Sequence, residues 1–320
     1  AMHRILQSNS KGLNFEIISN PEFLAEGTAV RDLENPDRIL IGSMGSRNGK
    51  LAAQKIADIY AHWVPRDKIL LTNVWSSELS KLVSNAMLAQ RISSINSISA
   101  LCEKTDADID EVAKAVGMDS RIGSKFLKAG VGFGGSCFKK DILNLVYLCD
   151  FYGLKEVSEY WKKVLDINDY QERRFVLNII RNMFNTIAGK KIAVFGFAFK
   201  ADTGDTRESP AIYIVRKLIE EKAEVCIYDP KAMENASREL ADCAGKFSFA
   251  RNHIDCVKGA HAVAILTDWR EFANYDYKKI FTLMESPSFI FDGRNILNMK
   301  ELSKIGFSVF SIGKTPIKKV

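Results

Sequence analysis

Two different spacings of apolar residues alternate along the chain, and together they predict an α/β protein. Short apolar runs at 15–19 and 38–42 are typical of strands, and the second ends in glycine. Between 51 and 63 the apolar residues recur with the helical period. Strands that alternate with helices favour a parallel sheet, so residues 1–73 are expected to form part of an N-terminal Rossmann-type domain. The pattern opens without a preceding strand, glycine turn and helix.

The segment from Trp75 to Cys102 carries the helical period without interruption by Pro or Gly. Ser76 or Ser77 is expected to cap this helix, with Glu78 in its first turn. Further helical stretches follow to about Phe184. Residues 74–188 are therefore expected to form a central helical domain that contains one long helix.

From residue 189 onward the strand signals return. Apolar runs at 191–196, 223–229, 261–266, 289–291 and 307–312 predict strands. Ser209 followed by Pro210 predicts a helix start, because Pro is tolerated in the first helical turn. Residues 189–320 are expected to form a Rossmann-like, doubly wound C-terminal domain.

Composition narrows the class of protein but not its function. The chain has 320 residues, is 47% hydrophobic and 26% charged, and carries a net charge of +6. No apolar run approaches a membrane span and no signal-peptide core is present, so we expect a cytoplasmic protein without a membrane or nucleic-acid partner. The six cysteines and four histidines have no metal-ligand spacing, and we expect no metal site.

The segment 130–141 carries the strongest chemical signal. Four glycines in six residues allow close approach of the backbone to a ligand, and an apolar helical pattern follows. Ser136 is expected to be the N-cap, with Cys137 in the first turn, where the helix dipole, Lys139 and Lys140 favour a thiolate. Asp141 shares a helix face with Cys137. The alternative is a glycine turn before a helix whose first apolar residue happens to be Cys.

Weaker candidates lie elsewhere, each with a simpler structural alternative. Glu22 and Glu26 follow a strand, as active-site residues of parallel sheets do, but Asn-Pro-Glu also describes a plain helix start. Lys81 and Asn85 share a helix face, as an exposed pair would. Arg121 and Lys128 flank the glycine segment and could hold phosphate or simply be solvated. The loop 197–210, with Lys200 and Arg207, occupies a position typical of nucleotide-binding loops. No G-x-G-x-x-G occurs in the chain.

Taken together, these segments resemble the UDP-glucose 6-dehydrogenase family. The resemblance rests on N-P-E-F-L-A-E-G-T-A (20–29), N-P-D-R (35–38), W-S-S-E-L-S-K-L (75–82), N-A-M-L-A-Q-R-I-S-S-I-N-S-I (85–98), G-F-G-G-S-C-F-x-K-D (132–141), G-F-A-F-K (196–200), T-R-E-S (206–209) and F-D-G-R (291–294). The segments occur in the family's order and cover nearly the whole chain. The resemblance of 75–102 favours the UDP-glucose enzymes over their GDP-mannose and UDP-N-acetylmannosamine relatives.

The resemblance implies an NAD-dependent, four-electron oxidation of UDP-glucose to UDP-glucuronate. Cys137 would form a thiohemiacetal and then a thioester, which water cleaves. Glu22 would be the general base for that water, and Lys81 would stabilise the oxyanion. Asn85 and Asp141 would orient these groups.

The resemblance also implies the binding residues. Those matched to UDP-sugar contacts are Glu22, Phe23, Leu24, Ala25, Glu26, Lys81, Asn85, Arg121, Lys128, Phe133, Gly134, Phe199, Lys200 and Arg294. Those matched to NAD contacts are Glu26, Cys137, Lys140 and Arg207. The family oligomerises through its helical domain, which implies a homo-oligomer (a dimer or a hexamer).

The amino end departs from the family pattern. Only about twenty residues precede Glu22 here, whereas the family has a strand, a G-x-G-x-x-G turn and a helix before the matching position. We therefore expect the main NAD-binding site to be missing from this chain, which would make it weakly active or inactive alone. Two alternatives stay open: a UDP-sugar-binding and oligomerisation module without hydride transfer, and a dehydrogenase of a related nucleotide sugar.

Overall fold

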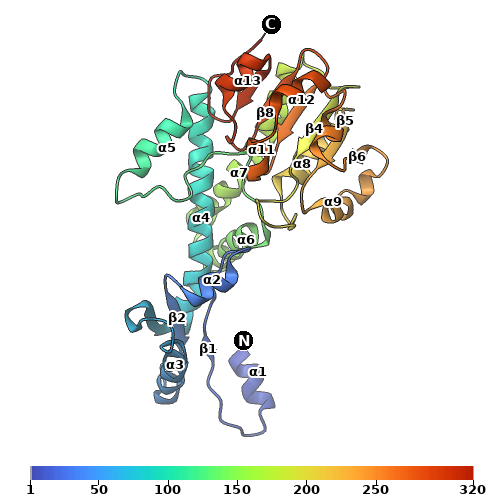
Figure 1. The fold of residues 1–320 in the computed structure, drawn as a ribbon. Helices are drawn as coiled ribbons and strands as arrows, with labels where there is room; N and C mark the ends of the chain where they lie inside the picture. Colours follow the sequence, from blue (N-terminus) through green and yellow to red (C-terminus); the bar gives the residue numbers. More distant parts are fainter. Residues whose placement is uncertain (1, 320) are drawn as a thin grey trace. The chain divides into compact units, whose positions relative to one another are not determined.

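The computed structural model describes residues 2–319, and the chain divides into two compact units, Ala1–Asn85 and Ala86–Val320 (Figure 1). Each unit has its own apolar core. The two units are described separately below.

The first unit is a small α/β layer. A three-stranded sheet has the order β1-β2-β3, in which β2 and β3 are parallel and β1 is antiparallel to β2. Helix α3 packs on this sheet through Ala53 and Ala57, against Ile39 and Ile41 of β2. The elements are α1 (Met2–Asn9), β1 (Ile18–Ser19), α2 (Ala29–Glu34), β2 (Ile39–Ser43), α3 (Arg47–Tyr60), a 3-10 turn η1 (Arg66–Lys68) and β3 (Ile69–Asn73).

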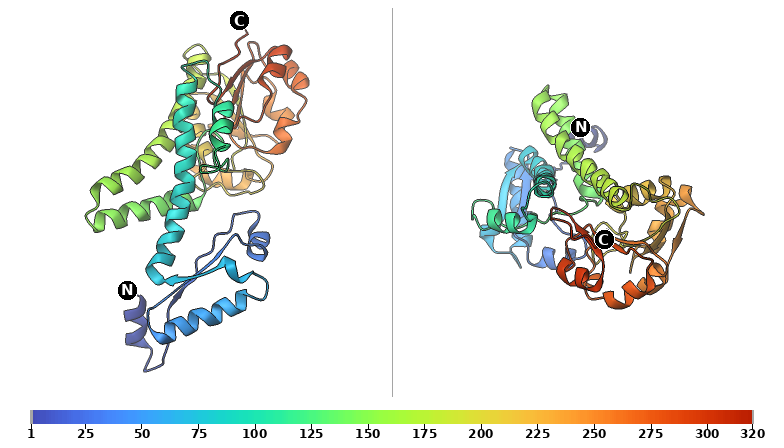
Figure 2. Two further views of the ribbon diagram at one scale, coloured as in Figure 1. Left: turned by 90° about the vertical axis from the view of Figure 1, so that its left-hand side faces the viewer. Right: turned by 90° about the horizontal axis from the view of Figure 1, so that it is seen from above.

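Helix α4 (Val74–Cys102) begins directly after β3 and confirms the long uninterrupted helix expected from the sequence (Figure 2). The expected cap is wrong. Asn73 accepts a hydrogen bond from the Ser76 amide through its side-chain oxygen at 2.8 Å, so Ser76 and Ser77 lie inside the helix. Asn73 is itself a favourable capping residue.

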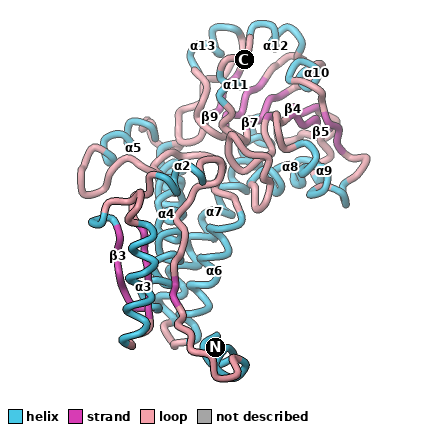
Figure 3. Tube along the Cα trace, turned by 60° about the horizontal axis from the view of Figure 1, so that its bottom comes forward, coloured by secondary structure: helices cyan, strands magenta, loops and turns pink. Residues whose placement is uncertain are grey.

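The helices that begin the second unit surround one end of α4. They are α5 (Ile109–Gly117), α6 (Ser136–Phe151) and α7 (Lys155–Asn182). Figure 3 shows α6 and α7 side by side as a helical hairpin. Their core is formed by Ala86 and Ala89 of α4 together with Ile142, Leu145 and Val164.

The second unit continues into a six-stranded, fully parallel sheet with the order β6-β5-β4-β7-β8-β9. Two separate apolar clusters, one on each face of the sheet, confirm the doubly wound arrangement. The strands are β4 (Lys191–Phe195), β5 (Glu224–Tyr228), β6 (Phe247–Phe249), β7 (Ala262–Ile265), β8 (Phe289–Asp292) and β9 (Ser308–Ser311). The remaining helices are α8 (Pro210–Glu220), α9 (Met233–Glu239), α10 (His253–Val257), α11 (Arg270–Ala273), α12 (Tyr277–Leu283), α13 (Met299–Ile305) and the turn η2 (Ala241–Cys243).

Some expected elements differ from the observed ones. The strand expected at 15–19 is only two residues long, and β3 and β6 were not expected. The Ser209 cap is confirmed, because its side chain accepts from the Ala211 amide. Over the described residues, no helix is both long and apolar enough to cross a membrane.

Candidate functional site

The glycine segment before α6 adopts a conformation that its sequence makes possible. Gly132 and Gly135 have φ angles of 126° and 86°, a region that favours glycine. A methyl group on Gly134 would lie 2.5 Å from the Glu208 carbonyl oxygen and 2.8 Å from Cβ of Phe199. The Gly135 amide donates to the Arg207 carbonyl at 2.9 Å. The segment therefore packs directly against the loop between β4 and α8.

Cys137 is the second residue of α6 and is exposed, as expected for a reactive thiol at a helix start. The expected role of Ser136 is wrong: Gly135 is the N-cap, and Ser136 is the first helical residue. Its hydroxyl lies 3.8 Å from the Cys137 sulfur, near enough for a weak hydrogen bond. The helix amides near Cys137 thus lack a side-chain cap, which suits a position where negative charge develops.

The charged residues that follow Cys137 have partners of their own. Lys139 donates to Glu208 at 2.7 Å, and this bond raises the pKa of the lysine. Lys140 lies 3.6 Å from Asp141, whose side chain is buried. Lys139 therefore ties α6 to the β4–α8 loop, rather than serving only as a positive charge beside the thiol.

Arg294 joins three loops. Its guanidinium donates to the carbonyl oxygens of Leu266 (2.6 Å), Gly132 (3.1 Å) and Phe199 (3.3 Å). These carbonyls come from the end of β7, the glycine segment and the loop after β4. The carboxyl ends of parallel strands are where such sheets bind nucleotides, and β4 and β7 are neighbours whose connections leave in opposite directions.

Other candidate binding residues lie in or next to the three loops that Arg294 joins. Lys128 lies 3.9 Å from Asp268, and Lys200 lies over the Phe199 ring at 5.6 Å. Arg207 forms a close ion pair with Asp205 at 2.6 Å. Arg121 is not brought to this group by any contact that we observe: its side chain is 87% exposed and pairs with Asp119.

A cavity of about 1050 Å³ lies beside the glycine segment, between α6, α7 and α8. Charged residues of both signs line it, including Lys139, Arg207 and Glu172. Burial, followed by the negative charge of Asp169, raises the pKa of Glu172 to about 8. Glu172 is therefore largely protonated at neutral pH.

Several polar residues that the sequence did not single out hold these loops. Asn168 of α7 binds both backbone groups of Phe133, and Gln171 donates to the Gly130 carbonyl at 2.6 Å. Asp229, at the end of β5, accepts from the amides of Phe197 and Ala198. A usable signal existed for α7, because Asn168 and Gln171 interrupt an apolar helical stripe that includes Val164 and Phe175.

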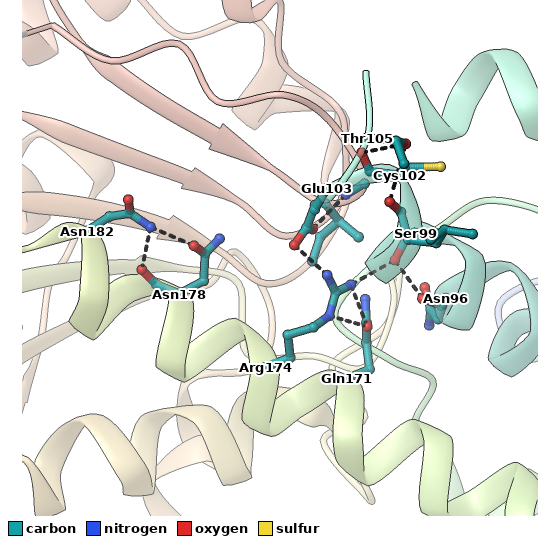
Figure 4. Close-up of polar contacts among 12 residues, drawn as sticks. Asn96, Ser99, Cys102, Glu103, Thr105, Gln171, Arg174, Asn178 and Asn182 are labelled. Carbon is teal, nitrogen blue, oxygen red and sulfur yellow. Dashed lines mark hydrogen bonds and ion pairs between the residues drawn. The ribbon is translucent and has the colours of Figure 1, made fainter. Parts of the chain in front are cut away.

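Figure 4 shows the polar contacts that continue from Gln171. Arg174 donates to Gln171 and to Ser99 of α4, and forms an ion pair with Glu103. Glu103 also accepts from the Gly313 amide at 2.8 Å. Helix α7 is therefore fixed to α4 and to the segment after β9.

In the first unit, Glu22 and Lys81 lie together. The lysine nitrogen is 3.1 Å from Oε1 of Glu22, whose other oxygen accepts from the Leu24 amide at 2.6 Å. The Phe23 ring has the Arg38 guanidinium 3.8 Å and the Lys81 nitrogen 5.5 Å from its centroid.

The remaining candidates of this unit flank that pair. The Ala25 amide donates to Asp32, and Glu26 is exposed. Asn85 lies one turn beyond Lys81 on α4 and is largely buried. The described residues hold no group of three or more His, Cys, Asp or Glu side chains suited to a metal ion.

The strand-to-helix connections of the first unit do not fit a dinucleotide pyrophosphate. After β2, the Ser46 hydroxyl already accepts from the Gly49 amide and donates to the Glu16 carboxylate. After β3, the Asn73 side chain accepts from the Ser76 amide in the first turn of α4. Each helix start therefore has a first-turn amide already bonded to a side chain, whereas a pyrophosphate site needs these amides free.

Family models match the chain in three consecutive parts. They are the NAD binding domain (residues 1–64), the central domain (75–170) and the UDP binding domain (193–299) of the UDP-glucose/GDP-mannose dehydrogenase family. A UDP-glucose 6-dehydrogenase of Oryza sativa subsp. japonica is 56% identical over 98% of this chain and 69% of its own length. The chain belongs to this dehydrogenase family.

Two further relatives agree with this membership. A UDP-glucose 6-dehydrogenase of Arabidopsis thaliana is 55% identical over 98% of the chain and 69% of its own length. A solved UDP-glucose dehydrogenase from Pyrobaculum islandicum has a TM-score of 0.85 at 31% identity, covering 98% of this chain and 67% of that one. The matches to these relatives extend over both units of the chain. The chain is shorter than either relative.

Proposed function

We propose that this chain supplies the UDP-sugar site and the covalent chemistry for the NAD-dependent oxidation of UDP-glucose to UDP-glucuronate. The observation that carries the proposal is the junction at Arg294. The guanidinium of the half-buried Arg294 holds the glycine segment, the β4–α8 loop and the β7 end together, and Cys137 follows at the next helix start. The names of the UDP-glucose relatives support the choice of sugar nucleotide.

The second unit would hold the nucleotide. Lys128, Phe133, Gly134, Phe199, Lys200 and Arg294 would contact the UDP-sugar, and Arg121 would reach the ligand of a neighbouring subunit. A cationic, glycine-lined surface at the carboxyl ends of parallel strands suits a diphosphate. Lys140 and Arg207 would contact the cofactor.

Cys137 would add to the C6 aldehyde of the sugar. The thiolate forms a carbon–sulfur bond, and the carbonyl oxygen takes a proton, giving a thiohemiacetal. After oxidation to the thioester, water attacks the same carbon, and the carbon–sulfur bond breaks to release the carboxylate and the thiol. Asp141 would orient groups around Cys137.

The first unit would serve the proton transfers. Glu22 would take a proton from the attacking water, and Lys81, with Asn85, would stabilise the oxyanion. Phe23, Leu24, Ala25 and Glu26 would contact the ligands. The contact between Glu22 and Lys81 supports this division, since it presents a carboxylate and an ammonium side by side.

The two oxidations need a hydride acceptor, which in the proposed reaction is NAD. Because no G-x-G-x-x-G occurs in the sequence and the helix starts of the first unit do not fit a pyrophosphate, we expect this chain alone to bind NAD weakly. That observation favours a second candidate: a UDP-sugar-binding module that oligomerises without hydride transfer. Exposed Tyr147 and Phe151 on α6, with Tyr152 and Leu154 in the turn before α7, support an oligomer through the helical domain.

Calorimetry with UDP-glucose, and with GDP-mannose as the comparison, tests the binding site. We expect UDP-glucose to bind more tightly; tighter binding of GDP-mannose would contradict the proposed substrate. Cys137→Ser should retain UDP-glucose binding. An absorbance assay for NADH separates the two candidates, because measurable NADH production by this chain excludes the module without hydride transfer.

Alkylation with iodoacetamide, followed by peptide mass spectrometry, tests the thiol. We expect Cys137 to react at least about tenfold faster than the buried Cys102, Cys149, Cys226 and Cys256. Cys243, which is half-buried, is the internal comparison. Faster modification of Cys243 than of Cys137 would contradict the assignment of Cys137 as the reactive thiol.

A further inference from the structure

Side chains of α7 form hydrogen bonds with the backbone of the glycine segment (residues 130–135). Asn168 accepts from the Phe133 amide at 2.8 Å and donates to the Phe133 carbonyl at 3.2 Å. One turn along, Gln171 donates to the Gly130 carbonyl, while Asn96 of α4 accepts from the Gly130 amide at 2.9 Å. Both peptide groups that bracket Val131 and Gly132 are therefore fixed by side-chain amides.

Asn168 uses its side-chain oxygen as an acceptor and both of its amide hydrogens as donors. Its oxygen takes one hydrogen bond, and its two amide hydrogens go to Phe133 and to Oε1 of Glu172 at 3.0 Å. Only 6% of Asn168 is exposed, so water cannot replace these partners freely. An added Cβ at Gly132 would lie 3.0 Å from Oδ1 of Asn168, which shows how closely the backbone approaches the amide.

Glu172 completes the arrangement from the cavity side. Groups of both signs face it: Asp169 and Arg173 from α7, Lys139 from α6, and Glu208 from the loop before α8. Glu172 has no observed hydrogen bond to the glycine segment itself, so any influence on that segment passes through Asn168.

We propose that Asn168, oriented by Glu172, is a positioning residue that sets the geometry of the 130–135 segment for UDP-sugar binding and for the Cys137 helix start. The inference rests on the proposed function of the UDP-sugar site. Phe133 and Gly134 are the expected ligand contacts, and Asn168 holds the first of them by both of its backbone groups. These hydrogen bonds, which we call the Asn168 clamp, would therefore act on the ligand through the Phe133 backbone.

Asn168→Asp is the sharpest test, because it keeps the size and the acceptor but removes both donors. The Phe133 carbonyl then loses its partner and faces a carboxylate. We expect UDP-glucose affinity to fall at least about fivefold, because the segment is no longer held in the geometry that contacts the ligand. We also expect Cys137 alkylation at pH 7 to slow by roughly threefold, since a displaced helix start stabilises the thiolate less.

Asn182→Asp is the matched control on the same helix. The Asn182 side chain donates to Asn178 of the same helix, as Figure 4 shows. It should leave both the affinity and the alkylation rate within about twofold of the parent chain. If Asn168→Asp behaves like Asn182→Asp in both measurements, whatever its melting temperature, the positioning role is overturned.

A second pair of variants keeps the inference testable if Asn168→Asp fails to fold. Glu172→Gln keeps an acceptor for Asn168, whereas Glu172→Leu removes it. We expect Glu172→Leu to bind UDP-glucose roughly threefold more weakly than Glu172→Gln. Equal affinities overturn the role of Glu172 in orienting Asn168.

Hydrogen exchange of the 130–135 amides separates this inference from the proposed function. If the parent chain does not bind UDP-glucose, the proposed function fails, yet the clamp still predicts about tenfold faster exchange in Asn168→Asp than in Asn182→Asp. Unchanged exchange across the segment would overturn the clamp even where UDP-glucose binds as proposed.

Discussion

The Lys81 ammonium nitrogen lies 3.1 Å from Oε1 of Glu22, although 59 residues separate the two in sequence. Side-chain exposure is 21% for the lysine and 58% for the glutamate, so solvent screens the pair. Such a pair contributes little to folding. The pair does, however, present a carboxylate and an ammonium group together on the first unit.

Replacing Lys81 should therefore weaken UDP-glucose binding while changing the free energy of unfolding very little. We expect Lys81→Met to change the free energy of unfolding by less than about 1 kcal/mol. The same variant should weaken UDP-glucose binding about tenfold, the cost of losing a charged hydrogen-bond donor. Urea denaturation and calorimetry measure the two effects. Lys55→Met, an exposed change on α3, is the control and should alter neither.

Glu172 should make stability depend on pH. Burial raises its pKa from an ordinary 4.5 to about 8, so between these values the folded chain holds a proton that the unfolded chain has released. Stability therefore falls as pH rises through this window. Glu172→Gln removes this titration. The free energy of unfolding of Glu172→Gln, relative to that of the parent chain, should therefore grow by on the order of 2 kcal/mol from pH 5 to pH 8.

Urea denaturation at a series of pH values measures this advantage. Glu159→Gln, an exposed change on the same helix, is the control and should track the parent at each pH. A constant gap between Glu172→Gln and the parent would show that the carboxyl titrates normally.

Arg294 should not tolerate conversion to lysine. A lysine cannot reproduce the planar set of donors that binds the Leu266, Gly132 and Phe199 carbonyls. We expect Arg294→Lys to destabilise the chain by about 2–4 kcal/mol and to abolish measurable UDP-glucose binding. Arg270→Lys, at the exposed start of α11, provides the matched comparison in thermal unfolding and should be neutral.

Gly134 should be intolerant for steric reasons. The added methyl of Gly134→Ala meets the Glu208 carbonyl, which is backbone and cannot rotate away. We expect the 130–135 segment to separate from the β4–α8 loop, with UDP-glucose affinity reduced roughly tenfold or more. Gly45→Ala has open space around the new methyl and should bind as the parent does. Equal affinities for the two variants would contradict the close packing of these loops.

Local patterns predicted much of the fold. The period of α4, the Ser209–Pro210 helix start and the strands β4, β5, β7, β8 and β9 were all readable from apolar spacing. Strand β6 was missed because its polar surroundings and three-residue length give little periodicity. Strand β3 was missed although Ile69, Leu70 and Leu71 form a short apolar run directly before the long helix.

The candidate site was predictable where the chemistry is local. The exposed thiol of Cys137 near a helix start follows from neighbouring residues. The capping errors at Ser76 and Ser136 arose because Asn73 and Gly135 compete for the same position one to three residues earlier. The interrupted apolar stripe could have marked Asn168 as a buried polar residue, but its partner and that of Asp229 could not be assigned, since they lie 35 and 32 residues away in sequence.

The hydrogen bond between Glu103 and the Gly313 amide closes a loop of 210 residues. Contacts this distant in sequence cost more loop entropy than local ones, so we expect this contact to form late in folding. Weakening the bond should accelerate unfolding far more than it slows refolding. We therefore expect loss of this contact to shorten the lifetime of the folded second unit and to become apparent first as faster proteolysis.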